Sequence, residues 1–186
     1  NIPSINYLGA LDDGSGHWAT GYWNDALHPN NLGHGEMYYA VAPSMFDAIT
    51  AGKTTSPQIA GTNSHLRLQR DAAEASPLRF TPGHPVHSFT MSFRVRSTDV
   101  GTIAAVAVVS SRATLEIRDT SLVYIGPTGS ELSAPMDAND GRWHDVALSH
   151  RHATGQSLLF VDGVLKGTVS DSYLPDQFVI GGAAGA

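Results

Sequence analysis

The sequence predicts two structural classes in succession, a short α/β segment and then an antiparallel β-sandwich. The first observation is a change of hydrophobic period: apolar residues recur every three or four positions up to residue 49, and every second position from residue 87 onward. The second is an aperiodic segment at residues 53–57, which is typical of a linker. The third is a series of short strand-like runs with no helical pattern between them, which favours a sandwich or jelly roll.

The α/β segment begins with a short apolar run at residues 2–7, which we expect to be a strand. A loop rich in glycine, aspartate and serine follows at residues 12–20. A helix is predicted after Pro29, with one apolar stripe at three- and four-residue spacing. The stripe consists of Tyr38, Val41, Ala42, Met45, Phe46 and Ile49. Pro43 lacks a backbone donor and predicts a kink there, and Gly52 is a suitable C-cap.

The second part of the chain shows strand-like alternation. In residues 87–96, Phe89, Met91, Phe93 and Val95 fall on one face and polar side chains fall on the other, which is the pattern of a half-buried strand. Similar runs lie at residues 102–109, 114–118, 122–125, 146–150 and 158–161. After the last run, Asp162-Gly163 suits the positive φ angles of a tight hairpin turn.

Composition argues against several function classes. The net charge is −6 and no basic cluster occurs, so we expect no nucleic-acid partner. No apolar run approaches the roughly 20 residues of a membrane span. There is no cysteine for a disulfide or a thiolate zinc site, and the loop aspartates lack calcium-loop spacing. We therefore expect neither a metal nor an organic cofactor.

The strongest chemical signal is a carboxylate three residues ahead of a histidine, at the mouth of the predicted helix. A serine hydroxyl needs a neutral imidazole to take its proton and a carboxylate to fix the tautomer of that imidazole. Asp25 is predicted to hold the ring and His28 to shuttle the proton, while Asn30 or Asn31 can cap the helix. An ordinary surface turn with a solvated histidine has the same spacing, so that interpretation stays open.

Residues 25–30 read Asp-Ala-Leu-His-Pro-Asn and are followed by Gly33-His34 and an apolar helix. This order resembles the last conserved block of the SGNH/GDSL hydrolases and covers about the first 50 residues. The resemblance implies that residues 1–52 are the final strand and helix of a flavodoxin-like catalytic domain. It also implies that Asp25 and His28 are the carboxylate and base of a catalytic triad.

The nucleophile of that family is missing from the chain. Its serine lies in a Gly-Asp-Ser block, whereas Asp13-Gly14-Ser15 has another order, and Gly61-Thr62-Asn63 lies on the wrong side to be the oxyanion block. We therefore expect a second polypeptide that carries the serine and the oxyanion hole. The start at Asn1 likewise suggests a processed or excised piece.

A second resemblance covers residues 60–183. A strand led by Trp143, followed by a hairpin that turns at Asp162-Gly163, resembles the laminin-G and concanavalin A-like lectin superfamily. It implies a linker at residues 53–59 and a jelly roll at residues 60–186. Residues 178–182 match the penultimate strand of the family, so the closing strand is expected to be missing.

Two hypotheses of function follow. In the first, the chain is part of a secreted SGNH-type serine esterase that acts on an ester, with an O-acylated carbohydrate as the expected substrate class. In the second, it is a non-catalytic lectin-like module that binds carbohydrate or protein. The content of 19 glycines and 10 prolines, with 15% charged residues, is common in secreted carbohydrate-active proteins and is compatible with both.

Overall fold

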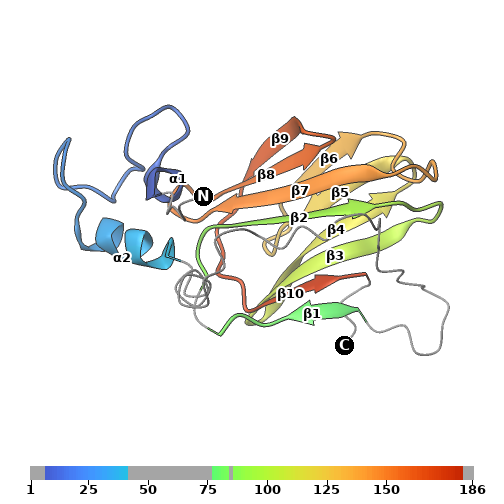
Figure 1. Ribbon diagram of the computed structural model, residues 1–186, viewed down its shortest axis with the longest axis horizontal. Helices are drawn as coiled ribbons and strands as arrows, with labels where there is room; N and C mark the ends of the chain where they lie inside the picture. The colour runs from blue at the N-terminus through green and yellow to red at the C-terminus, as the bar shows by residue number, and fades with distance from the viewer. Residues whose placement is uncertain (1–6, 42–76, 84–85, 182–186) are drawn as a thin grey trace, which may run out of the picture. The chain divides into compact units, whose positions relative to one another are not determined.

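The computed structural model describes residues 7–41, 77–83 and 86–181 (Figure 1). The chain divides into two compact units, Asn1–Arg67 and Leu68–Ala186. Residues 2–6 of the predicted strand, the apolar stripe beyond Val41 and the predicted linker at residues 53–59 lie outside the described residues. Within the described part, no helix has the length and apolar character that a membrane span requires.

The described residues of the first unit, 7–41, form two short helices joined by a long loop. Tyr7, which we expected in a strand, instead opens helix α1 (Tyr7–Leu11). The loop is held by two isolated β-bridges, Asp12 to Trp18 and Trp23 to Pro29. The α/β architecture predicted for this unit therefore stays a prediction, because the strand it needs is not among the described elements.

Helix α2 (Asn31–Tyr39) begins as the sequence predicts. The Asn30 side chain accepts hydrogen bonds from the backbone N–H groups of Leu32 and Gly33, which confirms it as the N-cap. Gly33 is needed for close approach, since a Cβ there would collide with the Tyr22 carbonyl oxygen and lie 2.7 Å from the Pro29 Cβ. The helix start is thus packed directly against the loop that carries Asp25 and His28.

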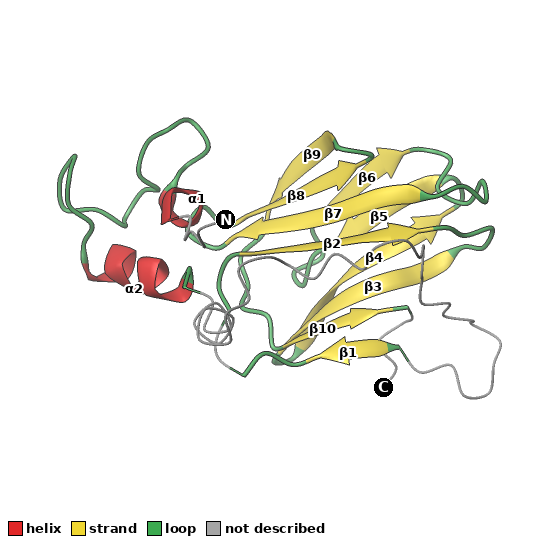
Figure 2. Ribbon diagram, in the orientation of Figure 1, coloured by secondary structure: helices red, strands yellow, loops and turns green. Residues whose placement is uncertain are grey.

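The second unit consists of two antiparallel sheets, shown as yellow strands in Figure 2. The larger sheet contains, in spatial order, β1 (Leu78–Phe80), β10 (Gln177–Ile180), β3 (Gly101–Val108), β4 (Ser111–Arg118), β5 (Ser121–Ile125) and β6 (Glu131–Pro135). The smaller sheet contains β2 (Phe89–Val95), β7 (His144–Arg151), β8 (Gln156–Val161) and β9 (Val164–Ser170). This arrangement is the sandwich that the strand pattern predicts.

The core lies between the two sheets and follows the alternation of the strands. In β4, Ala113, Leu115 and Ile117 are buried and alternate with more exposed residues. They belong to one apolar cluster with Leu148 of β7 and Leu159 of β8 from the other sheet. Because inward side chains recur at every second position, the opposite side chains of β2, β7 and β8 form an outer face.

The six predicted alternating runs correspond to β2, β3, β4, β5, β7 and β8, and the predicted penultimate strand corresponds to β10. The hairpin prediction is also confirmed, since Asp162 and Gly163 have φ values of 52° and 75° between β8 and β9. Three strands were not predicted, namely β1, β6 and β9.

Candidate functional site

A groove on the outer face of the smaller sheet is the main candidate site. The strand register places Ser92 opposite Ala147 and Ala147 opposite Phe160, and it places Arg94 opposite Asp145. The groove has a volume of about 450 Å³, within the range common for ligand sites. Its lining consists of Ser92, Phe93, Arg94, Asp145, Val146, Ala147, Phe160 and Gly163.

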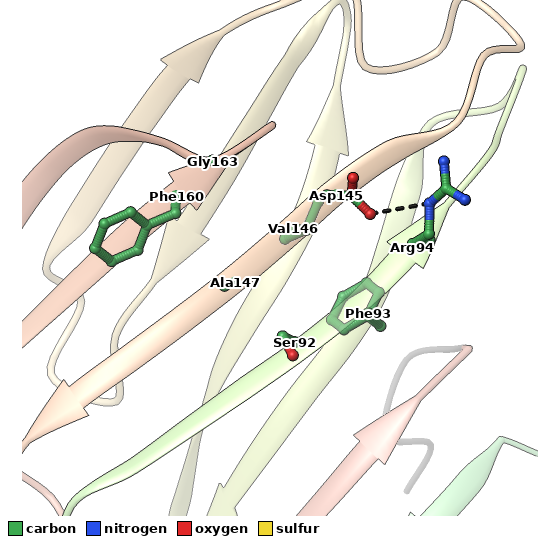
Figure 3. A pocket seen from close by; sticks show the side chains of 8 residues that line it. All are labelled: Ser92, Phe93, Arg94, Asp145, Val146, Ala147, Phe160 and Gly163. Atoms are coloured by element: carbon green, nitrogen blue, oxygen red, sulfur yellow. Dashed lines mark ion pairs between the residues drawn. The ribbon is translucent and has the colours of Figure 1, made fainter. Parts of the chain in front are cut away.

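The side chains of the groove differ in character from one side to the other. Figure 3 shows the half-buried Phe160 ring on one side and the Arg94–Asp145 pair on the other, with the small residues Ser92 and Ala147 between them. The pair joins Arg94 Nε to Asp145 Oδ1 at 2.9 Å. A guanidinium has five N–H donors, so this single contact leaves several of them for a ligand. The groove therefore combines an aromatic surface with a planar pair of polar groups.

The hairpin beside the groove is held by turn aspartates. Asp162 Oδ1 accepts the backbone N–H of Asp145 at 2.9 Å, and Asp162 Oδ2 lies 3.0 Å from His144 Nδ1. Asp140 Oδ1 lies 3.3 Å from the other ring nitrogen of His144. The hydrogen bond to Asp162 raises the pKa of His144, with burial opposing it and Asp140 adding to it. These contacts fix the first residues of β7 and with them Asp145.

The structure brings together the two residues predicted to be catalytic. His28 Nδ1 lies 2.9 Å from each carboxylate oxygen of Asp25. Asp25 Oδ1 also accepts the backbone N–H groups of Leu27 and His28. The Leu27 N–H and then the His28 ring hold the pKa of Asp25 below its ordinary value, despite opposing desolvation. Both side chains are exposed to solvent.

Ser15 lies in a polar turn rather than in a family-type nucleophile block. Its Oγ lies 2.7 Å from Asp13 Oδ1 and 3.0 Å from His17 Nδ1, and Asp13 also accepts the Ser15 backbone N–H. The Trp18 Nε1–H donates to the Ala26 carbonyl at 3.1 Å, which ties this turn to the loop of Asp25. These bonds give the turn a structural role.

A buried polar network lies inside the sandwich and was not predicted from the sequence. His150, on the same face of β7 as Val146 and Leu148, is 1% exposed, and its Nδ1 lies 3.0 Å from Ser157 Oγ. Its ring stacks on that of Tyr173 with centroids 4.1 Å apart. The even spacing of His144, His150 and His152 predicts a solvated or partly buried sheet face, whereas His150 lies in the core. Val146, Leu148 and His150 follow one another at two-residue spacing, and the two apolar residues are buried. This spacing was the available signal that His150 also faces the core.

The network continues through Tyr124. Its hydroxyl lies 3.2 Å from Ser157 Oγ and 3.3 Å from the Tyr173 hydroxyl, and it donates a short hydrogen bond to Asp171 Oδ2. Burial lowers the pKa of His150 to about 4 and raises the pKa of Asp171 and of Tyr124. His150 is therefore neutral at physiological pH. The network joins β5, β7, β8 and the segment after β9 inside the core.

The fold of the second unit resembles known jelly rolls. Domains LG4-5 of the mouse laminin alpha1 chain align with a TM-score of 0.50 and 20% identity, over 60% of this chain and 33% of that one. A heptameric pentraxin from Limulus polyphemus aligns with a TM-score of 0.42 and 19% identity, over 56% of this chain and 57% of that one. The chain thus spans one third to somewhat over half of the length of these relatives.

Comparison of the sequence gives no further assignment. No protein-family model matches the chain, and no curated protein resembles it significantly in sequence. The described strands together with the laminin likeness show that the second unit has a laminin-G-like jelly-roll fold. The resemblance of the first unit to SGNH hydrolases stays a prediction from its residues.

Proposed function

We propose that the second unit is a saccharide-binding module and that the groove across β2, β7 and β8 is its binding site. One observation carries the proposal: Phe160 faces the Arg94–Asp145 pair across a floor of small residues in a groove of about 450 Å³. A pyranose ring has an apolar C–H face that packs on an aromatic ring. Its neighbouring hydroxyls fit two-pronged contacts with a guanidinium and a carboxylate.

The proposal is supported by the position of the groove residues on regular strands. Ligand groups are held precisely when the residues that contact them sit on regular elements rather than on mobile loops. Ser92, Arg94, Asp145, Ala147 and Phe160 all belong to paired strands. We further propose an extracellular location, supported by the likeness in fold to the laminin domains.

The test is binding of the full chain to a panel of neutral and acidic oligosaccharides, measured by isothermal titration calorimetry. We expect at least one saccharide to bind and Phe160→Ala to weaken that binding by about tenfold, because the stacking surface is lost. Phe80→Ala is the matched control, since Phe80 is an exposed aromatic residue of β1 in the other sheet. Equal loss of affinity in both variants, or no binding to any saccharide, would reject the proposal.

A second candidate function belongs to the first unit. We propose that Asp25 and His28 are the carboxylate and general base of a serine esterase whose serine and oxyanion donors lie on another polypeptide. The supporting observation is the pair of 2.9 Å contacts from His28 Nδ1 to Asp25, with Nε2 left for a serine hydroxyl. In such a site His28 takes the hydroxyl proton during acylation and returns a proton to the leaving alcohol.

A further inference from the structure

Two arginines gather around one tryptophan beside the groove. The Arg94 Cζ lies 5.7 Å, and the Arg96 Cζ 5.5 Å, from the centroid of the Trp143 ring. Arg94 and Arg96 follow each other at two-residue spacing along β2 and its extension, so both point to the outer face. Trp143 directly precedes β7. Because Arg94 also lines the groove, the Trp143 cluster adjoins the groove at this end.

The two guanidiniums differ in whether a carboxylate pairs with them. Arg94 is paired with Asp145, whereas no ion pair joins Arg96 to any carboxylate of the described residues. Contact with an aromatic face holds a guanidinium in place without neutralising it. Arg96 is thus a positioned positive charge in a chain whose net charge is −6. A local positive site on an otherwise acidic protein favours an anionic ligand.

We infer that the groove takes an acidic saccharide, with its carboxylate or sulfate group on Arg96 and its sugar ring against Phe160. This inference rests on the proposed saccharide-binding function and adds the ligand class. A guanidinium matches either anion through paired N–H donors. Arg94 remains paired with Asp145 and contacts the sugar hydroxyls, while Arg96 supplies the positive charge that binds the anionic group.

The experiment compares three trisaccharides on the full chain by calorimetry: trigalacturonate, its fully methyl-esterified form, and a sulfated galactose trisaccharide. The ester keeps the sugar skeleton and removes the charge. We expect at least one of the acidic sugars to bind about tenfold more tightly than the ester at low salt. This preference should shrink as salt rises from about 0.02 M to about 0.3 M, since the charge is exposed to solvent.

Two charge variants identify the residue responsible. Arg96→Gln should lose most of the preference for the acidic sugar while it keeps its affinity for the ester. Arg79→Gln is the matched control and should keep the preference, because Arg79 lies on β1 and bonds to Gln177 in the other sheet. Equal affinity for acidic and esterified sugars, or a full preference in Arg96→Gln, would overturn the inference and leave the proposed function standing. If none of the three sugars binds and no other saccharide does, both fail.

Discussion

His28 is the residue on which the esterase hypothesis depends. In a complex with the serine-bearing polypeptide, His28→Ala should lower turnover of a p-nitrophenyl ester by roughly four orders of magnitude, and Asp25→Asn by a comparable or smaller factor. Both side chains are exposed, so the fold should be unaffected. His34→Ala, which changes an exposed histidine of α2, is the control. Near wild-type turnover by His28→Ala would show that the pair is an ordinary surface turn.

His150 makes the stability of the sandwich depend on pH. Its pKa is about 4 in the fold and about 6.5 in an unfolded chain, so the unfolded state binds more protons between these values. Its stabilising contribution is therefore complete above pH ~6.5 and is lost as the pH falls towards ~4, by a few kcal/mol in all. The raised pKa of Asp171 acts in the opposite direction, since protonation favours the fold. Denaturant unfolding of wild type and His150→Gln at several pH values isolates the histidine.

His150→Gln keeps a polar group next to Ser157 and removes the titration. The difference in unfolding free energy between wild type and variant should shrink as the pH falls through this window. The titratable groups whose rings lie against that of His150, Tyr173 and His152, are present in both proteins, so their effects largely cancel. A difference that is constant from pH ~7 to ~4.5 would contradict a neutral, buried His150.

Among the structural elements, the hairpin between β8 and β9 allows a test of how a positive φ angle affects stability. Gly163 has a φ of 75°, and a Cβ there would meet no atom within 4 Å. Gly163→Ala should therefore destabilise the second unit by about 1 kcal/mol through backbone strain alone. Gly83→Ala is the control, because Gly83 also faces open space and has no positive φ. Denaturant midpoints of the two variants measure the difference, and equal midpoints would exclude the strain.

The sequence predicts the strands whose two faces differ in burial. The alternation in residues 87–96 corresponds to β2, with Met91 buried and Ser92 exposed. β1 has three exposed residues, and β9 begins with the exposed Val164 and Leu165, so neither shows the pattern of a half-buried strand. Hydrophobic period reports burial rather than hydrogen bonding, and strands with little burial are therefore missed.

The sequence predicted the Asp25–His28 pair but not the groove on the smaller sheet. Asp25 and His28 are three residues apart, and a local turn suffices to join them, so their contact follows from the sequence. The groove joins Arg94, Asp145 and Phe160 from three strands, and their proximity depends on the register of the sheet. β2 and β7 lie far apart in the sequence, so the sequence alone does not fix the register between them.

At the scale of the whole molecule, the esterase hypothesis predicts a partner. The purified chain alone should not hydrolyse p-nitrophenyl esters, because its described turn serine, Ser15, is not in a nucleophile block and no Gly-Asp-Ser occurs in the sequence. Native gel filtration of the natural protein, followed by denaturing electrophoresis, should reveal a second polypeptide. Serine-directed phosphonate labelling of the 186-residue chain, with turnover, would contradict this prediction.

The proposed function requires that a saccharide occupies the outer groove of the smaller sheet. Heteronuclear NMR titration of the labelled chain with the tightest-binding saccharide tests it most directly, because amide shifts locate the contact. We predict the largest shifts at Ser92, Ala147 and Phe160, with small shifts across β1 and β10, and Phe160→Ala should need about tenfold more saccharide for the same shifts at Ser92 and Ala147. Shifts concentrated on the larger sheet, or none at saturating saccharide, would contradict the account.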